Sequence, residues 1–272
     1  MRIGNRMFDT ENEIYIMGIL NLTPDSFFDG GAHKQMRDAL KHTEKMIREG
    51  ADIIDVGGES TRPSHVKISD CEERERIVPV IREIKREFDI PVSVDTYKPE
   101  VAKAALDAGA DMVNDVWGFK YDRKLADITA SYHAACCLMH NRKSFDYQDF
   151  VSDVIEELRE SVEIALSAGI PKTDIIVDPG IGFAKDTDMN LVITREVEKL
   201  KTLGCPILYA ASNKSFIGAV LNKEVENRLL GTLATTAWAV MNGCAFVRVH
   251  QVGENKQIIQ MTKAIMGGNT NG

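Results

Sequence analysis

Eight short apolar runs, spread along the 272-residue chain, constrain its fold more than any other feature. Nearly every run ends in a cluster of polar and charged residues, and amphipathic stretches of helical length lie between the runs. Continuous runs rich in Ile and Val are typical of parallel strands that are covered on both faces. We therefore predict eight strands that alternate with helices. The runs lie at 15–27, 51–63, 91–99, 111–118, 134–141, 174–186, 206–215 and 245–251.

The stretches between the runs carry start and stop signals of helices. Pro99 falls in the first turn of a helix predicted over 98–107, where no N–H is needed, and Gly109 follows the end of that helix. The turn sequence Glu-Gly-Ala-Asp at 49–52 returns as Ala-Gly-Ala-Asp at 108–111, which indicates a repeated unit. Further helices are predicted over 34–49, 70–87, 122–131, 150–168, 187–202, 224–241 and 253–265.

This alternation predicts an α/β fold, a (β/α)₈ TIM barrel in a single domain over residues 1–272, with its core at about 14–266. Right-handed crossovers between parallel strands would bring the chain round to closure. A doubly wound open sheet is the alternative, and length alone would also allow two smaller domains. In a barrel the carboxyl ends of the strands meet at one face, so the polar clusters together predict one site.

Composition limits the partners of the chain. The net charge of −8 is spread along the sequence without a basic block, which disfavours binding to nucleic acid or to a membrane surface. The five cysteines are odd in number and show no Cys-x-x-Cys spacing, as expected of a reduced, cytoplasmic protein. No apolar run approaches the length that crosses a bilayer. We expect small-molecule ligands, with any anionic group held by a local cluster of cations.

Three strand ends carry a carboxylate or a carboxamide, namely Asp95, Asn114 and Asp178. Burying such groups unpaired costs several kcal/mol, so they need a partner rich in N–H donors. The edge of an aminopyrimidinone offers N–H donors to the carboxylates and acceptors to the amide. Carboxylates could also hold Mg²⁺, but the amide between them and the lack of His favour a heterocycle. Met139 and Phe183, at neighbouring strand ends, either sandwich that flat ring or belong to the core.

A set of cations predicts an anion pocket at the same face. Arg248 and His250 share one face of the last strand because side chains alternate along a strand. With Asn21 at the end of the first strand, they would surround an anion at the place where many barrels bind phosphate. Lys214 could reach across the mouth, and Ser215 could lie at a helix N-terminus, which favours anions.

Two strand ends continue into long polar loops. The first, 21–31, could close over a substrate as a lid, or could be a simple Asx and proline turn. In the second, two glycines at 57–58 would let the backbone approach a ligand, and Thr61 and Arg62 are suited to bind an anion. A structural salt bridge of Arg62 or Glu59 is the alternative there.

Taken together, these motifs resemble the dihydropteroate synthases, a family of pterin-binding (β/α)₈ barrels in the folate pathway. The resemblance covers about residues 16–252 and is carried by the segments NLTPDSFFDGG, DVGGESTRP, SVDT, NDV, LMH, DPGIGF, S-x-K-S and RVH. It implies a transferase that joins 6-hydroxymethyl-7,8-dihydropterin pyrophosphate to p-aminobenzoate, with release of pyrophosphate and formation of 7,8-dihydropteroate.

The resemblance also implies roles for individual residues. The positions that hold the pterin edge are matched by Asp95, Asn114, Asp178 and Lys214. Met139 and Phe183, which could sandwich the ring, complete the set of residues expected to bind the pterin. Those expected to bind the diphosphate are Asn21, Arg248 and His250, with Asn21 also near Mg²⁺. Those expected to receive p-aminobenzoate are Phe28, Thr61, Arg62, Pro63 and Ser215, with Lys214 shared between the two substrates. Those expected to take part in catalysis are Asp95, Lys214, Arg248 and His250. The family further implies Mg²⁺ as cofactor, a homodimer, and sulfonamide binding at the p-aminobenzoate position.

Two positions depart from the family pattern. Asn213 stands where the family usually has Arg in an S-R-K-S segment, and Gln251 stands where it usually has Asp after R-V-H. The two changes would compensate each other if the usual residues formed an ion pair. They would equally suit a pterin-binding paralogue with weak or no synthase activity. A methyltetrahydrofolate methyltransferase shares a pterin pocket but is disfavoured by the long loops and the anion pocket.

Overall fold

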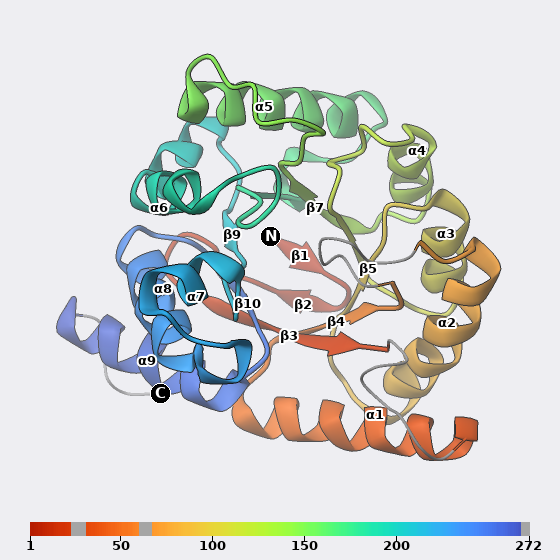
Figure 1. Ribbon diagram of the computed structural model, residues 1–272. Coiled ribbons are helices and arrows are strands. Elements are labelled where there is room, and N and C mark those ends of the chain that lie inside the picture. The colour runs from red at the N-terminus through yellow and green to blue at the C-terminus, as the bar shows by residue number, and fades with distance from the viewer. Residues whose placement is uncertain (23–30, 60–66, 268–272) are drawn as a thin grey trace.

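The computed structural model describes residues 1–22, 31–59 and 67–267. Within these residues, eight parallel strands form one sheet that curls into a barrel, with the helices on the outside (Figure 1). The order along the sheet is β8-β7-β6-β5-β4-β3-β10-β9. The strands are β3 (Tyr15–Asn21), β4 (Ile53–Gly57), β5 (Val92–Asp95), β6 (Met112–Asp115), β7 (Ala135–Met139), β8 (Ile175–Asp178), β9 (Leu208–Tyr209) and β10 (Phe246–Val249).

The two edges of this sheet meet between β8 and β9. Val177 of β8 forms a parallel bridge with Ile207, the residue before β9. The N–H of Val177 also donates to the carbonyl oxygen of Pro206 at 3.0 Å. The prediction of a (β/α)₈ barrel is therefore confirmed, and the alternative of an open sheet is wrong.

The register of the strands decides which side chains meet at the carboxyl edge of the barrel. Asn21 of β3 pairs with Gly57 of β4, which pairs in turn with Asp95 of β5. Asp95 pairs with Asn114 of β6. Four residues that are far apart in the sequence thus form one row across four neighbouring strands.

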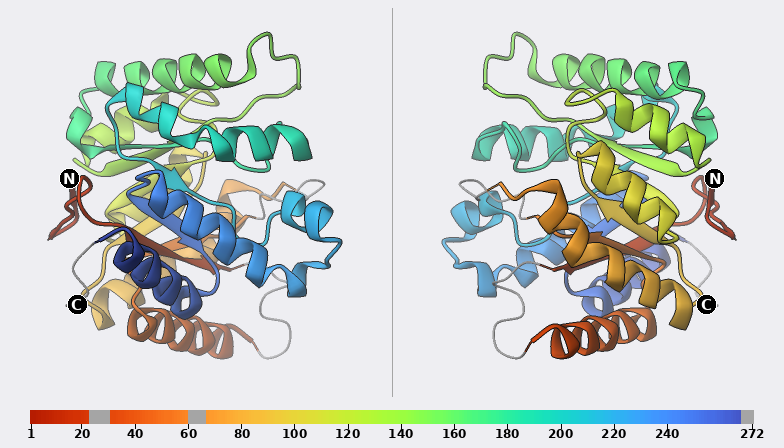
Figure 2. Two further views of the ribbon diagram at one scale, coloured as in Figure 1. Left: turned by 90° about the vertical axis from the view of Figure 1, so that its left-hand side faces the viewer. Right: turned by 90° about the vertical axis from the view of Figure 1, so that its right-hand side faces the viewer.

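The α-helices cover the outside of the barrel, as the two side views show (Figure 2). The helix predicted over 70–87 has these bounds in the structure, and most of the others agree within a few residues. In the described residues the helices are α1 (Gly31–Glu49), α2 (Asp70–Glu87), α3 (Pro99–Asp107), α4 (Lys124–Ser131), α5 (Phe150–Ser167), α6 (Thr187–Arg195), α7 (Ser215–Leu221), α8 (Leu229–Met241) and α9 (Val252–Ile265).

Three helical regions differ from the sequence prediction. The segment 187–202 is divided, because α6 ends at Arg195 and a 3₁₀ segment, Val197–Leu203, follows it. The segment 224–241 becomes α-helical only at Leu229, because Val225–Asn227 forms a separate 3₁₀ turn. α7 is too short for its periodicity to predict its span, although Ser215 lies at its start as expected.

A short hairpin covers the amino ends of the strands. β1 (Arg2–Ile3) pairs antiparallel with β2 (Arg6–Met7). Ile3 and Phe8 are buried in the interior cluster of the barrel, where the ring of Phe8 lies 5.9 Å from that of Phe246. Figure 2 shows the N-terminal hairpin and α7 at opposite ends of the molecule. The carboxyl edge is therefore the end at which a ligand can enter.

Two apolar layers stabilise the barrel. Because side chains alternate along a strand, Ile53 and Met112 pack inside the barrel, whereas Ile54 and Val113 pack against the helices. This two-sided burial is the reason why the strands read as continuous apolar runs. Among the described helices, none is long and apolar enough to cross a membrane.

Candidate active site

Arg248 is the centre of an ionic cluster at the mouth of the barrel. Its Nε donates to Oδ2 of Asp55 at 2.6 Å, and its Nη2 donates to Oδ2 of Asp95 at 2.6 Å. Nδ2 of Asn114 donates to the same oxygen of Asp55 at 3.2 Å. The cluster links β10 with β4, β5 and β6. Asp55, in β4, is fully buried.

The charges in this cluster do not balance, since two buried carboxylates face one guanidinium. Burial raises the pKa of Asp95 to about 7, although Arg248 acts in the opposite direction. Oδ1 of Asp95 and Oδ1 of Asp55 are buried and have no hydrogen-bond partner in the described structure. A ligand that brings an N–H donor to Asp95 would therefore satisfy a buried acceptor.

A cavity lies beside this cluster at the carboxyl ends of the strands. All six residues that the sequence predicts to bind a pterin line it, together with Arg248 and three apolar residues. The lining residues are Asp95, Asn114, Val116, Met139, Asp178, Ile181, Phe183, Ala210, Lys214 and Arg248. The sequence prediction did not include Val116, Ile181 and Ala210, because an apolar residue after a strand cannot be distinguished from core by its type.

Asp178 and Lys214 give this cavity a second pair of opposite charges. Oδ1 of Asp178 accepts a 2.6 Å hydrogen bond from the N–H of Gly180. Burial raises the pKa of Asp178 to about 6, against the effects of Gly180 and Lys214. Burial lowers the pKa of Lys214 to about 8, and the nearby Arg248 acts in the same direction. Both groups can change protonation state near neutral pH.

The loop after β8 supplies the aromatic wall of the cavity. Nζ of Lys214 lies 4.3 Å from the centre of the Phe183 ring, within the range of a cation–π interaction. Gly180 has a φ of +70°, and a Cβ there would lie 1.9 Å from the carbonyl oxygen of His140. Only glycine fits this position, so the sequence of the loop determines where Phe183 lies.

The lining combines a polar edge with apolar faces. Met139 belongs to a buried apolar cluster with Tyr97 and Val116, against which Phe183 packs. On the polar side, Asp95 and Asp178 accept hydrogen bonds, and Asn114 and Lys214 donate them. This arrangement matches a flat heterocycle with several N–H donors and an acceptor on one edge. The polar residues of this edge are Asp95, Asn114, Asp178 and Lys214.

The predicted anion pocket is only partly assembled as the sequence suggests. Asn21 and His250 lie at the ends of the neighbouring strands β3 and β10, and Nδ1 of His250 is 2.9 Å from Oγ of Ser212. Arg248, predicted as an anion-binding cation, has its charge paired with Asp55 and Asp95, because a buried guanidinium needs anionic partners. Ser215 is exposed at the start of α7.

Several predicted site residues lie outside the described parts of the chain, namely Phe28, Thr61, Arg62 and Pro63. Of the alternatives considered for the second loop, a structural salt bridge is found for Glu59, whose carboxylate binds Lys98 at 2.7 Å.

The two residues that depart from the family pattern are not hydrogen-bonded to each other within the described structure. The N–H of Asn213 donates to Oγ1 of Thr232 at 3.0 Å, and its carbonyl oxygen accepts from Nη1 of Arg228 at 3.1 Å. Oε1 of Gln251 is buried and has no hydrogen-bond partner among the described residues. Asn213 therefore has partners of its own, while Gln251 is left partly unsatisfied.

Known proteins are similar to this chain in both sequence and fold. The profile of the family described as pterin binding enzyme matches residues 17–250. The dihydropteroate synthase of Clostridium beijerinckii is 50% identical over 267 residues, which cover 98% of this chain and 99% of that protein. The matched region includes every residue that lines the cavity.

Two solved structures are similar over nearly their whole length. FolP (dihydropteroate synthase) from Clostridium difficile, in the presence of pteroic acid, has a TM-score of 0.93 and 47% sequence identity, and the match covers 95% of this chain and 99% of that one. Xanthomonas albilineans dihydropteroate synthase with 4-aminobenzoic acid has a TM-score of 0.90 and 37% identity, with 94% of each chain covered.

Proposed function

The chain belongs to the pterin-binding enzyme family, among the dihydropteroate synthases, which are transferases of folate biosynthesis, and from this premise we propose how its site works. The substrates are 6-hydroxymethyl-7,8-dihydropterin pyrophosphate and p-aminobenzoate, and the products are 7,8-dihydropteroate and pyrophosphate. The observation that carries this proposal is the single cavity lined by all six predicted pterin residues. Similar structures determined with pteroic acid and with 4-aminobenzoic acid support it.

We propose that the polar edge of the cavity binds the edge of the pterin. Oδ1 of Asp95, which has no partner in the described structure, would accept a hydrogen bond from the ring. Asp178 would accept another through the oxygen that does not bind Gly180. Asn114 and Lys214 would donate to the acceptors of the ring, which is the complementary half of the pattern.

The reaction replaces one bond of the pterin methylene carbon by another. The bond from this carbon to the diphosphate oxygen breaks, and pyrophosphate leaves with the electron pair. The aniline nitrogen of p-aminobenzoate forms the new bond and gives up a proton. We propose a dissociative, SN1-like order, in which Asp95 and Asp178 stabilise positive charge on the pterin. His250 would stabilise the negative charge on the leaving pyrophosphate, and Arg248 would add to this although it also binds Asp55 and Asp95. Because the leaving group departs first, the aniline nitrogen needs little activation.

We propose that Mg²⁺ binds together with the diphosphate. Within the described residues, no group of three or more His, Cys, Asp and Glu residues is placed to hold a metal ion. This fits Mg²⁺, which often takes only one or two protein oxygens and is otherwise bound by substrate phosphates. The amide oxygen of Asn21, at the end of β3, is suited to be such a ligand. When bound, Mg²⁺ would reduce the cost of charge on the departing pyrophosphate.

We propose that p-aminobenzoate binds on the side of the mouth at which α7 begins. The family resemblance assigns this substrate to Thr61, Arg62, Pro63, Ser215 and Phe28, with Lys214 shared between both substrates. A sulfonamide has the size and the aniline group of p-aminobenzoate. We therefore expect sulfonamides to compete with p-aminobenzoate but not with the pterin.

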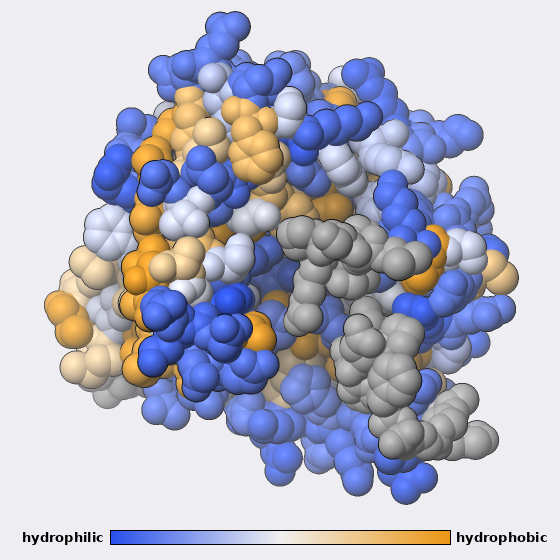
Figure 3. All heavy atoms as spheres, in the orientation of Figure 1, coloured by the Kyte–Doolittle hydropathy of each residue, from blue (hydrophilic) through white to orange (hydrophobic). Residues whose placement is uncertain are grey.

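We also propose that the protein is a homodimer in the cytoplasm. Apolar side chains gather over α8 and α9 (Figure 3). They include Leu230, which is 78% exposed, and Met241, Met261 and Ile265, which are more than half exposed. Exposed apolar groups on neighbouring helices are typical of a surface that is covered by a second subunit.

The proposed function is tested by turnover of purified protein with dihydropterin pyrophosphate, p-aminobenzoate and Mg²⁺. Mass spectrometry would follow dihydropteroate, and a coupled assay would follow pyrophosphate. We expect equal amounts of both products, and we expect a chelator to stop their formation while a non-reactive pterin still binds. Tight pterin binding without either product would favour a paralogue that has lost the synthase activity. A chelator without effect would contradict the role given to Mg²⁺.

A further inference from the structure

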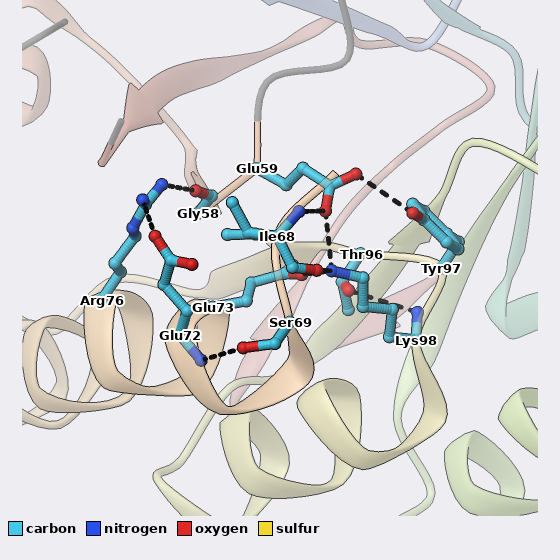
Figure 4. A network of polar contacts seen from close by, with 10 residues as sticks. All are labelled: Gly58, Glu59, Ile68, Ser69, Glu72, Glu73, Arg76, Thr96, Tyr97 and Lys98. Atoms are coloured by element: carbon cyan, nitrogen blue, oxygen red, sulfur yellow. Dashed lines mark hydrogen bonds and ion pairs between the residues drawn. The ribbon is translucent and has the colours of Figure 1, made fainter. Parts of the chain in front are cut away.

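A buried network centred on Lys98 binds the chain on both sides of residues 60–66 (Figure 4). Nζ of Lys98 donates to Oε2 of Glu59 at 2.7 Å and to the carbonyl oxygen of Ile68 at 2.8 Å. It also donates to Oε2 of Glu73, on α2, at 2.7 Å. The three acceptors match the three N–H donors of an ammonium group.

Further bonds hold the same two chain positions. The N–H of Ile68 donates to Oε2 of Glu59 at 3.2 Å, and the hydroxyl of Tyr97 donates to Oε1 of Glu59 at 3.0 Å. Nη1 of Arg76, on α2, donates to the carbonyl oxygen of Gly58 at 2.9 Å. Glu59 and Ile68, on the two sides of residues 60–66, are thus bonded to each other and, through Lys98, to α2.

The network costs free energy to bury. The exposed fractions are 7% for Lys98, 8% for Glu59 and 1% for Glu73, and two carboxylates share one ammonium group. Burial raises the pKa of Glu73, whereas its bonds to Lys98 lower it. A buried ion pair is often no more stabilising than apolar residues of the same size, so stability alone is a weak reason for this arrangement.

We propose that Lys98 is a positioning residue for the p-aminobenzoate step. It fixes Glu59 and Ile68, the points between which the chain carries Thr61, Arg62 and Pro63. This inference rests on the proposed function, because that function assigns these three residues to p-aminobenzoate. None of the residues of the network lines the pterin cavity. We therefore expect its loss to affect p-aminobenzoate more than the pterin.

The test compares Lys98→Met with a matched variant, Lys85→Met. Lys85 forms a 2.7 Å ion pair with Asp111, which precedes β6 at the amino end of the barrel. In Lys98→Met we expect the KM for p-aminobenzoate to rise at least tenfold, while the Kd of a non-reactive pterin changes less than twofold. Lys98→Arg should restore most of the lost affinity. Lys85→Met should lower the melting temperature without separating the two substrates.

A second measurement keeps the inference separate from the proposed function. Hydrogen exchange of the Ile68 amide, which is bonded to Glu59, should become at least tenfold faster in Lys98→Met and stay unchanged in Lys85→Met. If Lys98→Met does not fold, the double variant Lys98→Met with Glu73→Gln is used in its place, because it leaves one fewer unpaired buried charge. Equal changes for both substrates, or unchanged exchange at Ile68, would overturn the inference. An inactive wild-type protein would overturn the proposed function instead, and the exchange result would still be readable.

Discussion

Arg248 binds only one of the two carboxylate oxygens of Asp95. Nη2 of Arg248 donates to Oδ2 at 2.6 Å, while Oδ1 has no partner in the described structure. The carboxylate can therefore accept a hydrogen bond from the pterin without breaking its bond to the guanidinium. Positive charge that forms on the pterin would then interact with Asp95, and negative charge that forms on pyrophosphate would interact with Arg248, its partner in the ion pair.

This relationship predicts that Asp95→Asn lowers kcat by about 100-fold, since an amide cannot stabilise positive charge on the pterin. The variant should still fold, because Arg248 keeps its bond to Asp55. Steady-state kinetics and thermal unfolding measure the two effects. Asp111→Asn removes a carboxylate at the opposite end of the barrel and should affect stability only. Full kcat in Asp95→Asn would refute the electrostatic role of this carboxylate.

The pH dependence of pterin binding should have two limits. Asp178 has a pKa raised to about 6 and Asp95 one raised to about 7, both chiefly by burial, so affinity should fall as they take up protons below this range. Lys214 has a pKa lowered to about 8, so affinity should fall again when it loses its proton above that pH. Calorimetry with a non-reactive pterin from pH 5 to 9 measures both limits. Lys214→Arg should remove the alkaline limit, and a flat profile would contradict these assignments.

Asn213→Arg should keep the synthase activity within a few-fold of wild type. Asn213 has a left-handed backbone with a φ of +56°, which costs a larger side chain about 1 kcal/mol. Urea unfolding should show this loss. Asn222, with a φ of +51°, offers a matched variant, Asn222→Arg, with a similar loss. A folded but inactive Asn213→Arg protein would indicate that the site has changed its chemistry.

Leu230→Glu should weaken the proposed dimer by about 2 kcal/mol, or roughly 30-fold in Kd, because it places a charge on the apolar surface of α8. Sedimentation over a range of concentrations measures this change. Met7→Glu is the control, since Met7 is similarly exposed, at 74%, in the hairpin at the amino end of the barrel. A monomeric wild type would remove the basis for this prediction.

The barrel could be predicted because each of its strands and helices has a sequence pattern that can be recognised locally. Strands buried on both faces must be apolar throughout, and the polar residues that follow them must lie at the carboxyl edge. Asp95, Asn114 and Asp178 could be grouped for this reason alone. The pairing of Arg248 with Asp55 could not be predicted, because it depends on which side chains reach across the barrel axis. The network of Lys98 was missed because a lysine beside a helix start usually remains in water.

Gly180 limits how this enzyme can change under selection. With the carbonyl oxygen of His140 only 1.9 Å from the place of a Cβ, every substitution requires the backbone beside the pterin cavity to move. Such a movement would also displace Phe183, and with it the natural substrate. We therefore expect that no substitution of Gly180 would give resistance to an inhibitor that contacts this wall of the cavity. Escape from it would have to arise at other residues of the chain.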